Sequence, residues 1–233
     1  MTAQDQPTDL TRTARITGLL YLGLAITGGL GFLAIRPQLY DAGDPAATLS
    51  NVLDHELLAR TGIALELGTV LTQALVAVAF FALFRSVNTL AAGAVAAFGM
   101  VNAVAIMVGS GVLLHGVQSA AGDVTVPDPQ AVLQSAYAID EQLWLVGGLF
   151  FGLWLIPMGW LVLRSGWMPA PLGWILIAGG VGYVLATLLE VLFPDLPVVA
   201  DLLPLLATVG ELWIISYLLV RGVRETAHTP VAA

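Results

Sequence analysis

The sequence predicts an all-α fold: a six-span transmembrane helical bundle with two short amphipathic helices on the outer surface and both termini in the cytoplasm. Three observations predict it, namely the composition, six long apolar runs and the unequal distribution of arginine. Of the 233 residues, 58% are hydrophobic and 10% are charged. A soluble domain carries roughly 25% charged residues, because its surface faces water. This composition therefore predicts a surface that mostly faces lipid.

The six apolar runs predict the six spans. A helix needs about 20 apolar residues to cross roughly 30 Å of hydrocarbon, and in lipid only helices and closed barrels satisfy the backbone. The runs are too long and too uniformly apolar for barrel strands. They cover residues 16–35, 61–84, 90–114, 142–163, 171–193 and 202–220. We expect one transmembrane domain at 16–221, between an N-terminal tail at 1–15 and a C-terminal tail at 222–233.

The first run is interpreted as a span rather than as a secretory signal. A signal peptide has an apolar region of about 7–15 residues followed by a cleavage site flanked by small residues. The run at 16–35 is longer, and no convincing cleavage site follows it. We therefore expect it to stay in the protein.

The arginines predict the orientation, because positively charged loops stay in the cytoplasm. The chain has no lysine, so arginine supplies all eight cations. The side that carries the N-terminus has Arg12, Arg15, Arg85, Arg164, Arg221 and Arg224. Arg36 and Arg60 fall on the other side with most of the acids, including Asp140, so we expect these charges at the outer surface. The protein is thereby predicted to be a multi-pass protein of the inner (cytoplasmic) cell membrane.

Two outer connections begin with Asp-Pro and predict the short amphipathic helices. Asp44 and Pro45 provide an N-cap and a proline at the first helical position. The segment 44–60 then alternates apolar and polar residues at helical spacing. The second connection, 128–142, begins in the same way and leads into the fourth span.

Polar residues on one face of the second span form the first candidate site. Glu66, Thr69 and Gln73 stand at i, i+3 and i+7, so they share a helix face, and polar faces point into a bundle. The third span carries Asn102 and Ser110 at comparable spacing.

The fifth and sixth spans carry the other intramembrane acids. Glu190 lies close to the outer end of the fifth span, and Glu211 lies near the middle of the sixth, one turn after Thr208. Intramembrane acids indicate a functional site by default.

Two interpretations of these acids stay open. In the first, Glu66, Glu211 and Glu190, helped by Gln73, Asn102, Thr69 and Thr208, form a path for a proton, a cation or a small solute. In the second, the protein is a non-catalytic sensor or assembly protein whose buried glutamates hold helices together, with Asn102 or Gln73 as hydrogen-bond partners. An enzyme is the third choice, because the chain carries no evident nucleophile–base pair.

Metals, cofactors and nucleic acid are not indicated. His55 and His115 fall near the outer surface and are weak candidates for a metal site, since a site needs more ligands than two histidines. The chain has no cysteine, which excludes disulfides and thiolate ligands. We expect no cofactor and no nucleic-acid partner; the lipid bilayer and a second copy of the chain are the expected partners.

Four segments carry a resemblance to a known family. RTGIALELG, LFFGLWLIPMGWLVLRSGWMPAPLGWIL, GYVLATLLEVLFP and VGELWIISYLLVRGV are similar to a bacterial family of integral membrane proteins catalogued only as a domain of unknown function, number 4386. The likeness runs from about Ala14 to Val223. It implies a six-span inner-membrane protein with no established activity, and it gives weight to Glu66 and Glu211. Members often have histidine after FFGL, where this chain has Trp154.

The predicted orientation can be tested with a reporter fused in the loop at 86–89. We expect the reporter to lie in the cytoplasm, because Arg85 precedes this loop. A reporter found on the outer side would overturn the predicted threading.

Overall fold

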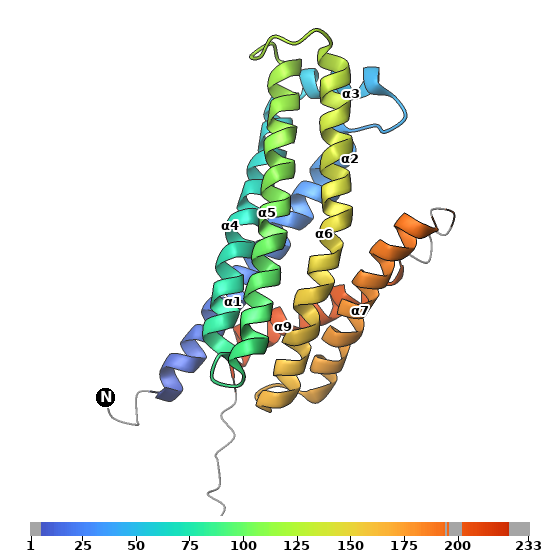
Figure 1. Ribbon diagram of the computed structural model, residues 1–233. Helices are drawn as coiled ribbons and strands as arrows, with labels where there is room; N and C mark the ends of the chain where they lie inside the picture. The colour runs from blue at the N-terminus through green and yellow to red at the C-terminus, as the bar shows by residue number, and fades with distance from the viewer. Residues whose placement is uncertain (1–5, 194, 196–201, 224–233) are drawn as a thin grey trace, which may run out of the picture. The chain divides into compact units, whose positions relative to one another are not determined.

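The computed structural model describes residues 6–193, 195 and 202–223, and each regular element among them is a helix (Figure 1). The all-α prediction is confirmed for this part of the chain. The elements are α1 (Gln6–Gly29), the π-helical segment η1 (Leu30–Ile35), α2 (Arg36–Leu39), α3 (Pro45–Asp54), α4 (Glu56–Phe84), α5 (Thr89–Ala120), α6 (Pro129–Ser165), α7 (Ala170–Leu192) and α9 (Leu205–Val220).

Five helical segments are long and apolar enough to cross a membrane. They are Leu10–Leu39, Glu56–Phe84, Thr89–Ala120, Pro129–Ser165 and Ala170–Leu192. Each contains most of one predicted run. The helix at the sixth run, α9, has 16 residues, fewer than the roughly 20 that a span needs. The sixth span therefore stays a prediction. Residues 1–5 and 224–233 of the two predicted tails lie outside the described residues, and α1 begins at Gln6, within the predicted N-terminal tail.

Both predicted Asp-Pro connections begin a helix, at Pro45 and at Pro129, but only the first of these helices is short and separate from the long helix that follows it. Asp44 caps α3 as expected, because its carboxylate accepts hydrogen bonds from Ala46 N at 3.0 Å and Ala47 N at 2.9 Å. Residues 129–142, in contrast, are the first turns of the 37-residue helix α6. Nothing in that segment interrupts the helix, and its buried residues Leu133 and Tyr137 continue the inward face of the span.

The helices form two compact units. The first, here called the Glu66 unit, comprises Tyr21–Leu75 and Gly99–Phe150; the second, the Glu211 unit, comprises the described parts of 1–20, 76–98 and 151–233. The helices α1, α4, α5 and α6 each contribute residues to both units.

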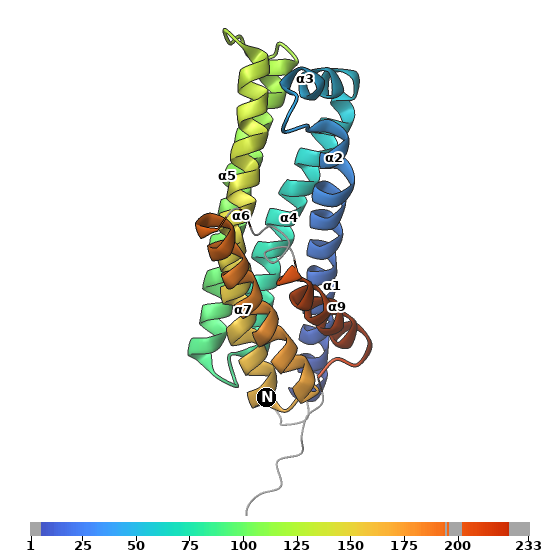
Figure 2. The same cartoon turned by 90° about the vertical axis from the view of Figure 1, so that its right-hand side faces the viewer.

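In the Glu66 unit, α3 and the connection at 121–128 lie at the same end (Figures 1 and 2). A cluster of buried apolar residues fills the space beneath α3. It joins Val52 of α3 to residues of the helices around it, including Leu39, Ile63, Val117 and Leu133.

In the Glu211 unit, glycines bring helix backbones into direct contact. A Cβ atom at Gly152 of α6 would lie 2.5 Å from the carbonyl oxygen of Gly180 on α7, and one at Gly180 would lie 2.7 Å from that of Gly152. Gly159 and Gly173 form a second reciprocal pair, one heptad along each helix. Small residues permit such close packing between membrane helices. Gly152 and Gly180 therefore serve close packing of α6 against α7.

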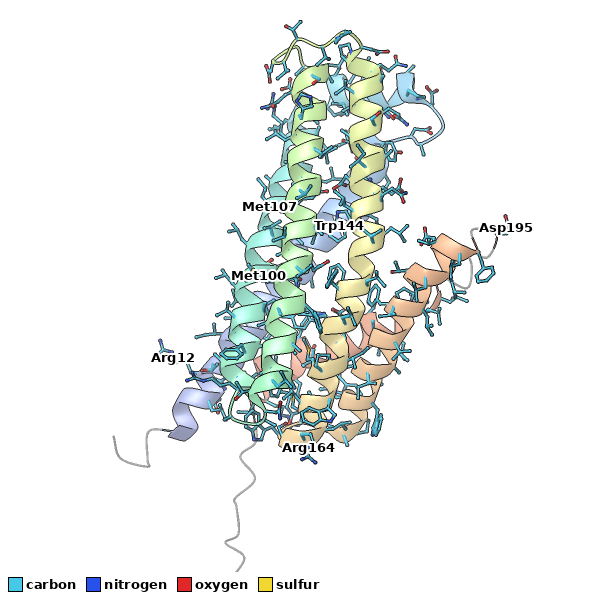
Figure 3. The ribbon with its side chains drawn as sticks, viewed as in Figure 1. Arg12, Met100, Met107, Trp144, Arg164 and Asp195 are labelled. Carbon is cyan, nitrogen blue, oxygen red and sulfur yellow. The ribbon has the colours of Figure 1, made fainter. Side chains whose placement is uncertain are left out.

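The Glu211 unit carries charges of opposite sign at its two ends. Arg12 and Arg164 lie at one end, and Asp195 lies at the other (Figure 3).

The glycine contacts can be tested with Gly159→Ala. We expect this change to lower the free energy of unfolding by about 1–3 kcal/mol, since the added methyl group would meet backbone atoms of α7. Gly111→Ala is the matched control, because nothing lies within 4 Å of a Cβ atom there. The measurement is denaturant titration of the protein in mild detergent. Equal stability of the two variants would contradict the predicted contact.

Candidate functional site

A buried ion pair forms the centre of the Glu66 unit. Arg36, the first residue of α2, donates from Nη1 to Asp140 Oδ2 of α6 at 2.5 Å, and from Nη2 to the backbone carbonyl of Tyr137 at 2.8 Å. The exposed fractions of the Arg36 and Asp140 side chains are 10% and 0%. The sequence placed both residues outside the predicted spans, whereas the structure places them within helices with their side chains buried.

Aromatic rings surround the guanidinium. The Arg36 Cζ atom lies 5.4 Å from the centroid of Phe32, 5.5 Å from that of Tyr40 and 5.8 Å from that of Tyr137. Each distance lies within the roughly 6 Å over which a cation is attracted to a ring face. Burial, followed by the nearby Glu141 carboxylate, raises the pKa of the Tyr40 hydroxyl above its ordinary value. Tyr40 therefore faces the cation as a neutral phenol.

Glu66 lies beside this pair. The residue is 9% exposed, and its carboxyl group accepts a hydrogen bond at Oε2 from the Ser110 hydroxyl of α5 at 3.0 Å. It also interacts electrostatically with Asp140 and Arg36 and contacts the Trp144 indole of α6. Trp144, labelled in Figure 3, in turn packs on Phe32 with ring centroids 5.4 Å apart. The site thus joins side chains from four helical segments.

Local features of the sequence make room for these side chains. A Cβ atom at Gly109 would collide with Asp140 Oδ1, so glycine on α5 permits the carboxylate to sit against that helix. The π-helical segment η1 precedes Arg36 directly. Inserted π turns recur at functional sites, because they change the direction of the side chains that follow.

A small cavity lies within the site. Its volume is about 20 Å³, which is enough for one water molecule. Arg36, Glu66 and Tyr137 line it, and the remaining lining residues are aliphatic or glycine, among them Ile35 and Leu113.

The polar residues predicted beside Glu66 are buried, but they do not bond to it as expected. The Thr69 hydroxyl donates to Thr27 Oγ1 at 3.1 Å or to Leu65 O at 3.0 Å. Gln73 and Asn102 are 0% and 1% exposed, and their amide groups make no hydrogen bond to the described residues. Glu66 therefore accepts its hydrogen bond from the Ser110 hydroxyl, not from the Gln73 or Asn102 amide.

The other predicted acids belong to the Glu211 unit. Glu190 and Thr208 are exposed, and Glu211 is partly buried on α9. Glu211 interacts electrostatically with Tyr183 of α7. The predicted path from Glu190 through Glu66 to Glu211 stays a prediction.

The two weak metal candidates are exposed. His55 follows α3 and His115 lies on α5. Among residues 6–193, 195 and 202–223, no group of three or more histidines and acids is placed to hold a metal ion.

Sequence reasoning missed Arg36, Asp140 and Tyr137 as members of the site. The predicted spans ended at residue 35 and began at 142, whereas the helical segments extend to Leu39 and begin at Pro129. One signal was present. Leu133, Ala136, Tyr137 and Asp140 recur at helical spacing, and all of them are buried. Continuing the apolar face of the fourth span backwards would have placed Asp140 on the inward side.

Comparison with known proteins identifies the family. A family model described as "Domain of unknown function (DUF4386)" matches residues 16–222. The chain belongs to this family. The resemblance seen in the sequence is confirmed, and the matched region includes each residue of the site. No curated protein and no solved structure matches the chain.

The buried pair of this DUF4386 protein can be tested with Arg36→Met. We expect a loss of about 3–5 kcal/mol in the free energy of unfolding, because two buried carboxyl groups lose their counter-charge. The double variant Arg36→Met/Asp140→Leu should recover much of this loss, since it replaces the pair with apolar groups. Denaturant titration in detergent measures both.

Arg60→Met is the matched control. Arg60 also pairs with acids, Glu56 and Asp123, both at 2.7 Å, but its side chain is 38% exposed. Exposed pairs contribute little to stability. If Arg60→Met lowered the free energy of unfolding as much as Arg36→Met, the buried Arg36–Asp140 pair would contribute no more to stability than an exposed ion pair.

Proposed function

We propose that this protein is a multi-pass membrane protein that binds and moves a proton or a small cation at Glu66. The observation that carries the proposal is the charge of the buried cluster. In this cluster a single guanidinium, that of Arg36, faces the carboxyl groups of Glu66 and Asp140. With both acids ionised the cluster carries one net negative charge, and a buried net charge is costly. One bound proton or monovalent cation makes the cluster neutral.

The membrane assignment rests on the helices and their exposed side chains. Leu33, Leu71 and Leu90 are 74%, 65% and 85% exposed, as expected for side chains that face lipid. The proposal includes α9 as a sixth span, the transmembrane domain at 16–221, and both tails in the cytoplasm. Arg12 and Arg164 at one end of the Glu211 unit support this orientation by the positive-inside rule. We place the protein in the inner cell membrane.

The parts of the site have distinct roles in this proposal. Glu66 carries the exchangeable charge, and the Ser110 hydroxyl holds its carboxyl group in position. Arg36 offsets Asp140, so that the exchangeable charge stays at Glu66. Buried polar groups on the same two helices, Thr69 and Gln73 of α4 and Asn102 of α5, are the candidates to continue a path.

Six spans are few for a transporter, so the proposal includes a homo-oligomer in the bilayer. Glu190, Glu211 and Thr208 belong to the other unit and enter the proposal only as sequence-based candidates.

One observation favours the alternative, a sensor or assembly protein with structural glutamates. The Glu66–Ser110 bond joins α4 to α5, and the Arg36–Asp140 pair joins α2 to α6, which is what a structural role would require. Flux and stability measurements separate the two functions.

The test is ion flux in proteoliposomes with imposed gradients of protons or alkali cations. We expect Glu66→Gln to abolish flux, because glutamine keeps the shape of the side chain but cannot exchange a charge. Glu56→Gln is the matched control on the same helix, and it should keep the wild-type flux because Glu56 is exposed. Unchanged flux in Glu66→Gln, with a stability loss of about 1–3 kcal/mol from a broken buried hydrogen bond, would support the structural alternative.

A further inference from the structure

We propose that the ion accepted at Glu66 is a proton rather than an alkali cation, and that Arg36 is the residue that sets this specificity. The inference rests on the proposed function and names its substrate. Three features of the site carry it: the size of the cavity, its few oxygen atoms and the position of the guanidinium.

The cavity is too small for a hydrated cation. At about 20 Å³ it has room for one water molecule. An alkali cation would have to enter without most of its hydration shell. A proton needs only one oxygen atom at a time, and a single water molecule beside Glu66 can deliver it.

The cavity also lacks the ligands that a dehydrated cation requires. Selective cation sites replace the hydration shell with several oxygen atoms, and even small hard cations take about six. Glu66 and Tyr137 are the lining side chains that carry oxygen; the remaining lining residues, apart from Arg36, are aliphatic or glycine. The backbone carbonyl of Tyr137 already accepts a hydrogen bond from Arg36.

The guanidinium adds an electrostatic barrier. Arg36 lines the same cavity as Glu66, and a fixed arginine in a narrow passage repels metal cations. It cannot easily turn away, since Asp140 and the three aromatic rings hold it. The repulsion acts on a proton too, but a proton bonds covalently to the carboxylate and becomes part of a neutral group. Arg36 therefore excludes metal cations, which keep their charge, more strongly than protons.

The groups that face Glu66 come from each element packed around it. Arg36 comes from α2, Ser110 from α5, and Tyr137, Asp140 and Trp144 from α6. Among these, Arg36 supplies the positive charge and Asp140 the second negative charge. The selectivity of the site is thus a property of the Arg36–Asp140 pair acting beside Glu66.

The experiment compares two ions in the same proteoliposomes. Proton flux is followed with a pH-sensitive dye enclosed in the vesicles, and sodium flux with radioactive sodium. We expect the wild-type protein to move protons and to move no sodium above the level of empty vesicles. Sodium flux that Glu66→Gln abolishes would overturn the inference and leave the proposed function intact. Flux of neither ion would overturn the proposed function and the inference with it.

A double variant tests the role of Arg36. Arg36→Gln/Asp140→Asn removes both charges of the pair and puts an amide oxygen where the guanidinium stood. We expect several-fold more sodium flux than in the wild-type protein, with size-exclusion chromatography to verify folding. Sodium flux that stays at the empty-vesicle level in this folded variant would overturn the assignment of specificity to Arg36.

A binding measurement gives an independent readout in detergent. If sodium shared the site with the proton, adding sodium chloride to the weakly buffered wild-type protein would release protons that choline chloride does not release. We expect no such difference. Release with sodium that is absent in Glu66→Gln would overturn the inference.

Discussion

The structure of the Glu66 unit depends on keeping a buried guanidinium neutralised. Arg36 cannot lose its charge, so its position at 10% exposure requires a counter-charge and hydrogen-bond acceptors close by. Asp140 and the Tyr137 carbonyl meet this requirement from α6. As a result, α2 is fixed against the N-terminal part of α6, and the rings of Phe32, Tyr40 and Tyr137 gather around the cation.

The neighbouring Arg36–Asp140 pair is what makes Glu66 a candidate for ion exchange. A single carboxyl group surrounded only by aliphatic side chains would stay protonated, because burying its charge is too costly. Beside Arg36 and Asp140 it belongs to a cluster that differs from neutrality by one charge, and it lines a cavity with room for one water molecule. This is the physical basis for proposing ion exchange in a family described only as a domain of unknown function.

The two units use different means to hold helices together. In the Glu66 unit, buried polar groups on several helices bond to one another, so packing there is coupled to charge. In the Glu211 unit, the reciprocal glycine contacts between α6 and α7 bring backbones together without polar side chains. Close contact between membrane helices relies on small residues of this kind.

The sequence by itself determined the helical class, five of the long apolar helices and the inward polar face of Glu66, Thr69 and Gln73. Those features follow from hydropathy and helical period, which are local. It did not predict that the helix beginning at Pro129 and the fourth apolar run form one continuous helix, nor that η1 and α2 extend the first helical segment to Leu39. Only the tertiary structure decided that Arg36 and Asp140, which lie 104 residues apart in the chain, pair within the core. A hydropathy pattern assigns a charge near the end of a span to the surface, whereas its actual burial depends on where each helix begins and on what packs against it.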